Sequence, residues 1–141
     1  MDKYTEANIV FSKFCNNYAG LKKELPIRPS EMGVLNIIVK REGHFTPVMI
    51  AELLDVSKPM VTAHITVLEK KGYIVREYSK DDRRSFYVIP TDKARELVKT
   101  TSETMSRYLH QIESALGEDD FETLLRILSD ANNIMSTMRR D

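Results

Sequence analysis

The chain has 141 residues, of which 42% are hydrophobic, and its 21 basic residues are balanced by 21 acidic ones. This composition is typical of one globular domain and excludes a disordered chain or a histone-like positive coat. No apolar run approaches the ~18 residues needed to span a membrane, and charges interrupt the N-terminus where a signal peptide would be apolar. A single cysteine, Cys15, can form no intramolecular disulfide, so we expect a cytoplasmic protein.

A first helix is predicted over residues 3–24, ahead of Pro26 and Pro29, and a second over residues 30–41. Apolar residues recur in the first helix at alternating spacings of three and four, which is the pattern of helices that pack against other helices. This N-terminal seam comprises Tyr4, Ala7, Phe11, Phe14, Tyr18, Leu21 and Leu25.

A helix-turn-helix is predicted next, with a support helix at residues 47–54 and a recognition helix at residues 58–71. Each helix is preceded by a hydroxyl residue and has a proline in its first turn, which is typical of a helix start: Thr46 with Pro47, and Ser57 with Pro59. Apolar residues form an inward stripe on the second helix: Val61, Ile65 and Leu68. This pattern predicts a protein that binds duplex DNA.

The outward side of the predicted recognition helix carries groups that suit the major groove. Lys58 lies near the helix N-terminus, where free N–H groups also bind phosphate, and Thr62 and Thr66 can touch base edges or thymine methyls. The alternative is that Ser57 is only an N-cap and the threonines are only solvated. His64 lies beside the inward stripe, and we interpret it as a packed or surface residue rather than a metal ligand.

Two short strands are predicted over residues 73–78 and 85–89, because β-branched and aromatic residues fill both. The hairpin and the helix end before it collect basic residues: Lys70, Lys71, Arg76, Lys80, Arg83 and Arg84. An arginine at such a hairpin tip can enter the minor groove, and Asp82 is close enough in sequence to Arg84 to orient it. The alternative is a solvated charged turn.

Two long helices are predicted over residues 92–116 and 120–138, the first capped by Thr91 and the second opened by a capping box of Asp119 and Glu122. The last helix carries a second seam: Phe121, Leu124, Leu128, Ala131, Met135 and Met138, widened by Leu125, Ile127 and Ile134. A DNA-binding core of about 60 residues leaves both seams uncovered, so we expect them to pack together and against a second copy. The alternative is packing within one chain.

The segment from residue 46 to 91 resembles the winged helix of MarR-type (multiple antibiotic resistance regulator) transcription factors. The resemblance is carried by AELLDVSKPMVTAHITVLEKKGYI and by the wing pattern Asp82-Arg83-Arg84-Ser85, and it extends to the long flanking helices. It implies a mainly α fold with a small β wing, as a single domain over residues 1–141. In that domain residues 30–91 form the DNA-binding lobe, with its wing at 73–89, while residues 1–28 and 92–141 form a helical dimerisation region.

The resemblance further implies a homodimer that binds a pseudo-palindromic double-stranded operator, with two recognition helices in successive major grooves. Arg84 takes the place of the wing arginine in the minor groove, and Asp82 that of its orienting partner. Ala63 and Val67 stand where many members carry basic or polar groups, so this helix is expected to read bases through apolar and hydroxyl contacts. The predicted DNA-binding residues are Ser57, Lys58, Pro59, Thr62, Ala63, Thr66, Arg76, Lys80, Asp82, Arg83, Arg84 and Ser85.

Members of the family often respond to small aromatic acids, and the residues that could border such an effector site here are Phe11, Tyr18, Arg28 and His44. The alternative is that these aromatics are core and that Arg28 is a solvated loop residue. Cys15 is interpreted as a buried inert thiol. No metal, cofactor or catalytic motif is recognised, so we expect a transcriptional regulator, and a repressor, rather than an enzyme. A winged-helix module that binds protein or RNA without operator specificity is the alternative function.

Overall fold

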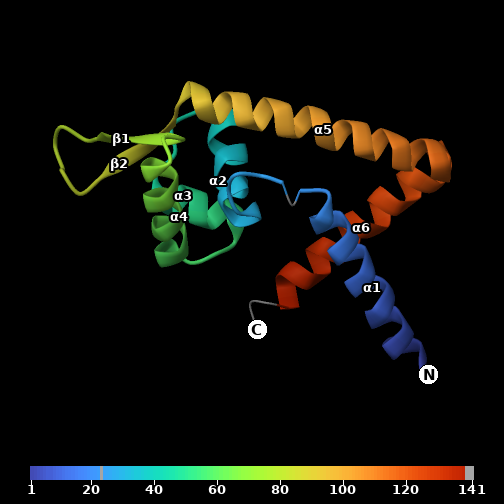
Figure 1. Ribbon diagram of the computed structural model, residues 1–141. Helices are drawn as coiled ribbons and strands as arrows, with labels where there is room; N and C mark the ends of the chain where they lie inside the picture. Colours follow the sequence, from blue (N-terminus) through green and yellow to red (C-terminus); the bar gives the residue numbers. More distant parts are fainter. Residues whose placement is uncertain (23, 139–141) are drawn as a thin grey trace. The chain divides into compact units, whose positions relative to one another are not determined.

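The computed structural model describes residues 1–22 and 24–138, and this part of the chain is mainly helical with one small sheet, as predicted. Figure 1 shows its elements in order along the chain. They are α1 (Lys3–Gly20), α2 (Pro29–Lys40), α3 (Pro47–Leu54), α4 (Lys58–Lys70), β1 (Ile74–Tyr78), β2 (Phe86–Pro90), α5 (Asp92–Leu116) and α6 (Glu118–Met138). The chain forms two compact units, Met1–Ser102 and Glu103–Asp141.

The predicted helix starts in the first unit are confirmed by their capping hydrogen bonds. Thr46 Oγ1 accepts the N–H of Met49 at 3.3 Å, and Ser57 Oγ accepts the N–H of Met60 at the same distance. These bonds satisfy N–H groups that have no partner within the helix. Local sequence therefore fixes where α3 and α4 begin.

The last turn of α1 differs from the prediction, which extended the helix to residue 24. The helix ends at Gly20, and the N–H groups of Leu21 and Lys22 turn to the carbonyls of Tyr18 and Ala19, three residues back. Such bonds tighten and close a helix end, and glycine is a weak helix former, so the helix stops before Lys22. Residue 23 of the predicted helix lies outside the described residues.

The start of α6 also corrects a prediction. The helix begins at Glu118, so Asp119 lies inside its first turn and does not act as the N-cap of a capping box with Glu122. Gly117 occupies the position before the helix with a φ of +93°, which glycine adopts without the steric penalty of a Cβ, and its carbonyl accepts the N–H of Phe121. Asp119 still stabilises the helix through its charge near the N-terminus.

The hydrophobic core of the first unit comes from α2, α3, α4, the hairpin and the beginning of α5. Its largest fully buried side chains are Leu35, Ile50, Ile65, Leu68, Ile74, Val34, Val61 and Val88. The predicted inward stripe of α4 is therefore confirmed, since Val61, Ile65 and Leu68 have no exposed surface. Burying this stripe leaves the opposite side of α4 facing solvent.

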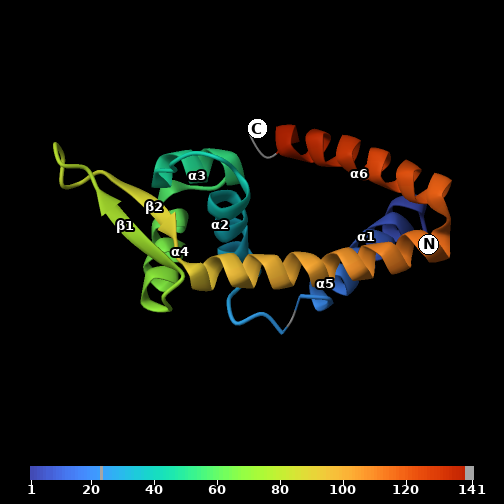
Figure 2. The same ribbon diagram turned by 90° about the horizontal axis from the view of Figure 1, so that it is seen from above.

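The hairpin is an antiparallel pair in which Arg76 lies opposite Val88 and Tyr78 opposite Phe86. The N–H of Val88 also bonds to the carbonyl of Phe45 at 2.8 Å, which ties β2 to the segment before α3. Figures 1 and 2 show the far end of the hairpin extending away from α3 and α4. Residues 79–85 are accordingly exposed.

Both predicted seams keep apolar surface open to solvent in the protomer. On α1, Phe11 and Phe14 are exposed, and on α6, Ile127 and Ile134 are 52% and 57% exposed. Cys15 is exposed as well, so its predicted burial does not hold within the protomer. No helix in the described part of the chain has the length and apolar character that crossing a membrane requires.

Candidate nucleic-acid interface

The N-terminal half of α4 presents a nearly uncharged face to solvent. Lys58, Pro59, Thr62 and Ala63 are all exposed there, and Met60 is 48% exposed beside them. The Ser57 oxygen is occupied by the cap, but its hydroxyl hydrogen can still be donated. This face therefore offers one cation, hydroxyls and methyl groups.

The threonine hydroxyls of α4 are oriented by the helix itself. Thr62 Oγ1 donates to the carbonyl of Lys58 at 3.0 Å, and Thr66 Oγ1 donates to the carbonyl of Thr62 at 3.1 Å. With its hydrogen used in this way, Thr62 turns oxygen lone pairs and a methyl group outward. Such a side chain can accept from the amino group of adenine or cytosine, or contact a thymine methyl.

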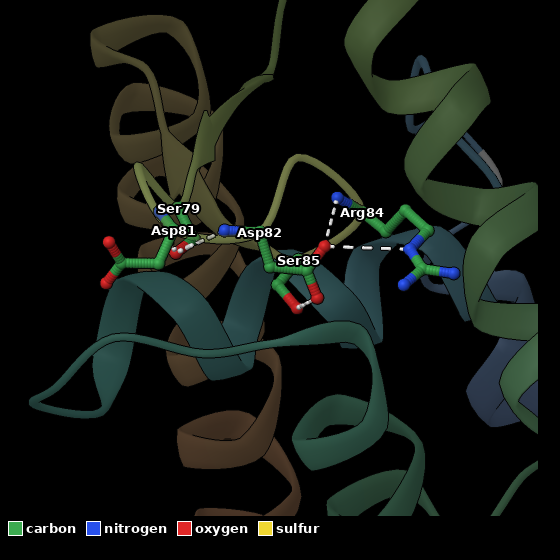
Figure 3. A network of polar contacts seen from close by, with 5 residues as sticks. All are labelled: Ser79, Asp81, Asp82, Arg84 and Ser85. Carbon is green, nitrogen blue, oxygen red and sulfur yellow. Dashed lines mark hydrogen bonds and ion pairs between the residues drawn. The ribbon is translucent and has the colours of Figure 1, made fainter.

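The tip of the hairpin is held by one carboxylate, as Figure 3 shows. Asp82 Oδ1 accepts the backbone N–H of Arg84 at 3.0 Å and lies 3.6 Å from its Nε, while Oδ2 accepts from the Ser85 hydroxyl at 3.3 Å. The predicted pairing of Asp82 with Arg84 is thus present. Ser79 Oγ accepts the N–H groups of Asp81 and Asp82, which closes the turn from the other side.

The Arg84 side chain is 94% exposed, so its ion pair with Asp82 is screened by water and adds little to the stability of the fold. The backbone hydrogen bond beside it has a different effect, because it fixes the direction in which residue 84 leaves the turn. Lys80 and Arg83 are exposed on the same turn. The tip is therefore a small ordered cationic projection.

A groove of about 390 Å³ is lined by both the wing and the recognition helix. Lys58 and Thr62 line it from α4, and Arg84 lines it from the hairpin. The remaining lining residues are Thr46, Pro47, Val48, Ser85 and Phe86. Residues predicted as DNA contacts from two separate elements thus face one space, and the start of α3 and Phe86 join them.

Sequence reasoning missed Thr46, Pro47, Val48 and Phe86 as part of this surface. The pattern of Thr46 and Pro47 predicts only a helix start, and Phe86 is predicted only as a strand residue. The signal that could have found them is the tight turn between α3 and α4. A helix-turn-helix holds its two helices in a fixed arrangement, so the starts of both helices can share one surface with the strand that follows the hairpin tip.

Arg76 and Thr66, two further predicted DNA contacts, contact each other instead of standing free. Arg76 Nη2 donates to Thr66 Oγ1 at 3.3 Å. Its Nε lies 3.3 Å from Glu69 Oε2, which makes an ion pair without hydrogen-bond geometry. The guanidinium also lies 4.7 Å from the centre of the Phe86 ring, and the side chain is only 19% exposed. Both residues therefore make contacts within the fold, and their role in DNA binding stays a prediction.

The four predicted effector residues are dispersed over different local contacts. Phe11 and Tyr18 are exposed on α1, and Tyr18 stacks on Phe14. The N–H of Arg28 donates to Glu31 at the start of α2, and His44 lies edge-on against Tyr87 of β2. Within residues 1–22 and 24–138, no polar or ring contact joins any two of the four. Their effector role stays a prediction.

Comparison with known proteins places this architecture in a family. Residues 25–85 match the sequence profile of the MarR family. The chain is 31% identical over 109 residues to the uncharacterized HTH-type transcriptional regulator YkoM of Bacillus subtilis, covering 77% of this chain and 70% of YkoM. It is 27% identical over 131 residues to the transcriptional repressor MprA of Escherichia coli, covering 92% of this chain and 74% of MprA.

A solved structure supports the same fold. FabT of Streptococcus pneumoniae, crystallised in complex with DNA, superimposes with a TM-score of 0.81 at 23% identity, covering 96% of this chain and 99% of FabT. The winged-helix fold agrees with the resemblance inferred from the wing motif. The match to the family profile and the similarity to YkoM agree with it as well. The chain therefore belongs to the MarR family of transcriptional regulators, which are not enzymes.

Proposed function

We propose that this protein is a DNA-binding transcriptional regulator that reads a pseudo-palindromic operator as a homodimer and represses transcription there. The observation that carries the proposal is the groove in which Lys58 and Thr62 of α4 face the same space as Arg84 of the wing. This arrangement would let α4 enter the major groove while Arg84 enters the adjacent minor groove.

The chemistry of the two parts suggests different contributions to binding. The exposed face of α4 carries lone pairs and methyl groups, which discriminate base edges without much charge. The wing tip carries Lys80, Arg83 and Arg84, which suit phosphates and the negative potential of a narrow minor groove. We therefore assign sequence reading to α4 and a large share of affinity to the wing.

The relatives support DNA binding and repression. FabT was crystallised with DNA, and MprA is named as a transcriptional repressor. A regulator of this kind acts on chromosomal DNA, which agrees with the cytoplasmic location expected from the sequence.

Selection of bound duplexes from a random pool tests the proposal directly. The expected product is an inverted repeat whose half-sites lie about one helical turn apart, and autorepression would place a copy upstream of the gene itself. A pool that yields no enriched duplex sequence, while single-stranded RNA or a protein partner is retained, would instead favour a winged-helix interaction module.

Lys58→Gln is expected to weaken binding to all duplex sequences to a similar extent, because a lysine at a helix N-terminus holds a phosphate rather than a base. The slope of log K against log salt should become smaller by about one, since one fewer counterion is released. Fluorescence anisotropy titrations over a salt series measure both effects. A selective loss for one operator sequence would show that Lys58 reads a base.

The proposed homodimer rests on the apolar surface that each protomer leaves open. On α6, Leu125, Ile127 and Ile134 remain about half exposed or more, and α1 exposes Phe11 and Phe14. Removing apolar helix faces of this kind from water is favourable. Single exposed apolar residues are common on protein surfaces, but two helical stripes of them indicate an interface.

Ile127→Lys is expected to convert a dimer to a monomer at micromolar concentration, because it places a charge in the proposed interface. Ile127 is 52% exposed in the protomer, so the protomer itself should stay folded. Sedimentation velocity measures the change. Asn133→Lys is the matched control, since it adds the same charge to an exposed position on the side of α6 opposite the seam. Dimer loss in both variants, or a monomeric parent protein, would refute the proposed interface.

A further inference from the structure

We propose that Arg76 is a positioning residue that sets the spacing between the recognition helix and the wing arginine, and so controls operator affinity through Arg84. The proposal rests on the proposed DNA-binding function and adds to it a residue that does not itself touch DNA. It replaces the direct DNA contact that the sequence suggested for Arg76.

The guanidinium of Arg76 connects two elements that must act together. From β1 it reaches back to α4, where Nη2 donates to Thr66 Oγ1 at 3.3 Å and Nε lies 3.3 Å from Glu69 Oε2. Its Cζ lies 4.7 Å from the centre of the Phe86 ring on β2. One side chain thus joins the C-terminal half of α4 to both strands of the wing.

Thr66 is prepared for this contact by the helix. Its hydroxyl hydrogen is donated to the Thr62 carbonyl at 3.1 Å, so an oxygen lone pair is left to accept from Arg76. At 19% exposure, the Arg76 side chain is largely removed from water, and a cation in that position needs these partners.

Phe86 connects Arg76 to the proposed DNA-binding groove. Its ring contacts both the Arg76 guanidinium and the ring of Tyr78, whose centre is 5.5 Å away. Phe86 also lines the groove shared by Lys58, Thr62 and Arg84. Because Arg84 precedes Phe86 by two residues, a shift of the ring moves the base of the wing tip relative to α4.

Lysine cannot reproduce this arrangement, although it keeps the charge. It has no planar fork to contact a hydroxyl, a carboxylate and a ring at the same time. Arg76→Lys should therefore leave the net charge and the counterion balance unchanged while it loosens the wing. A direct phosphate contact, in contrast, would be largely preserved by lysine.

The test is a double-mutant cycle with the full-length protein and the duplex recovered by selection. The variants are Arg76→Lys, Arg84→Ala and the double variant, with Arg95→Lys as a matched control in an ion pair of α5 outside the groove. We expect Arg76→Lys to raise Kd about fivefold to tenfold in the parent and less than about twofold in the Arg84→Ala background. Arg95→Lys should leave Kd unchanged.

Losses that multiply in the double variant would overturn the proposal, because Arg76 would then act independently of Arg84. An unchanged Kd in Arg76→Lys would overturn it as well. If thermal unfolding shows that Arg76→Lys does not fold, Thr66→Val replaces it in the cycle, since valine removes the acceptor oxygen and keeps the shape. Failure of the parent to select any duplex would refute the proposed function instead.

Discussion

Arg84→Ala is expected to weaken binding to the selected operator by about 1–3 kcal/mol, which corresponds to a rise in Kd of about 5- to 150-fold. The side chain is 94% exposed and its partner Asp82 is half exposed, so the protein gains little stability from their ion pair. Its removal should therefore leave thermal unfolding unchanged. The expected loss arises only when the guanidinium would enter the DNA. Gel-shift or anisotropy titration measures it.

The loss should depend on the flanking DNA as well as on the protein. Minor grooves of A·T-rich segments are narrow and strongly negative, so operators with such flanks should lose most when Arg84 is replaced. Asp82→Asn keeps an acceptor for the N–H of residue 84 and should cause a smaller loss. Equal affinity of the parent and Arg84→Ala for all operators would show that Arg84 takes no part in binding.

Ile65→Ala is expected to lower the free energy of unfolding by about 2–5 kcal/mol, a large part of the stability of a typical domain. Ile65 has no exposed surface and lies in the core cluster with Leu35 and Leu68, so its replacement leaves a cavity that neighbours fill only in part. Urea unfolding followed by circular dichroism measures the change.

Leu53→Ala is the matched control for this prediction. Leu53 is also a helix position of the first unit, but 43% of it is exposed, so its truncation should lower stability by less than about 1 kcal/mol.

At temperatures where Ile65→Ala remains folded, the operator affinity of this variant should stay close to that of the parent, because the Ile65 side chain faces the core. A loss of affinity without a loss of stability would contradict the assigned orientation of α4.

Local patterns in the sequence predicted the helix-turn-helix well. The caps at Thr46 and Ser57 and the stripe of Val61, Ile65 and Leu68 depend on residues three or four positions apart, and these relations survive in any fold that contains the helix. The contact of Asp82 with Arg84 was predictable for the same reason, since both residues belong to one turn.

Arg76 could not be interpreted from local pattern. In the sequence it is one of several basic residues of the hairpin, but its surroundings depend on the register of β1 with β2 and on the packing of α4 against β1. These tertiary contacts bring Glu69, Thr66 and Phe86 around it. A charge that appears solvated in the sequence is then largely buried.

The error at α6 has a different origin. Aspartate followed three residues later by glutamate favours a capping box, and Asp119 with Glu122 has that pattern. The structure starts the helix two residues earlier, at Glu118, because Gly117 can adopt a positive φ and supply its carbonyl to Phe121.

The separation of exposed and buried positions on α4 has a consequence for how such a regulator can diverge. Positions 58, 62 and 63 contribute no buried side chain to the core, so substitutions there leave folding nearly unaffected. After gene duplication, one copy could therefore acquire a new target sequence by changing these positions alone. The wing, which is held by contacts within its own turn and by Arg76, would continue to supply affinity while the specificity of the helix changes.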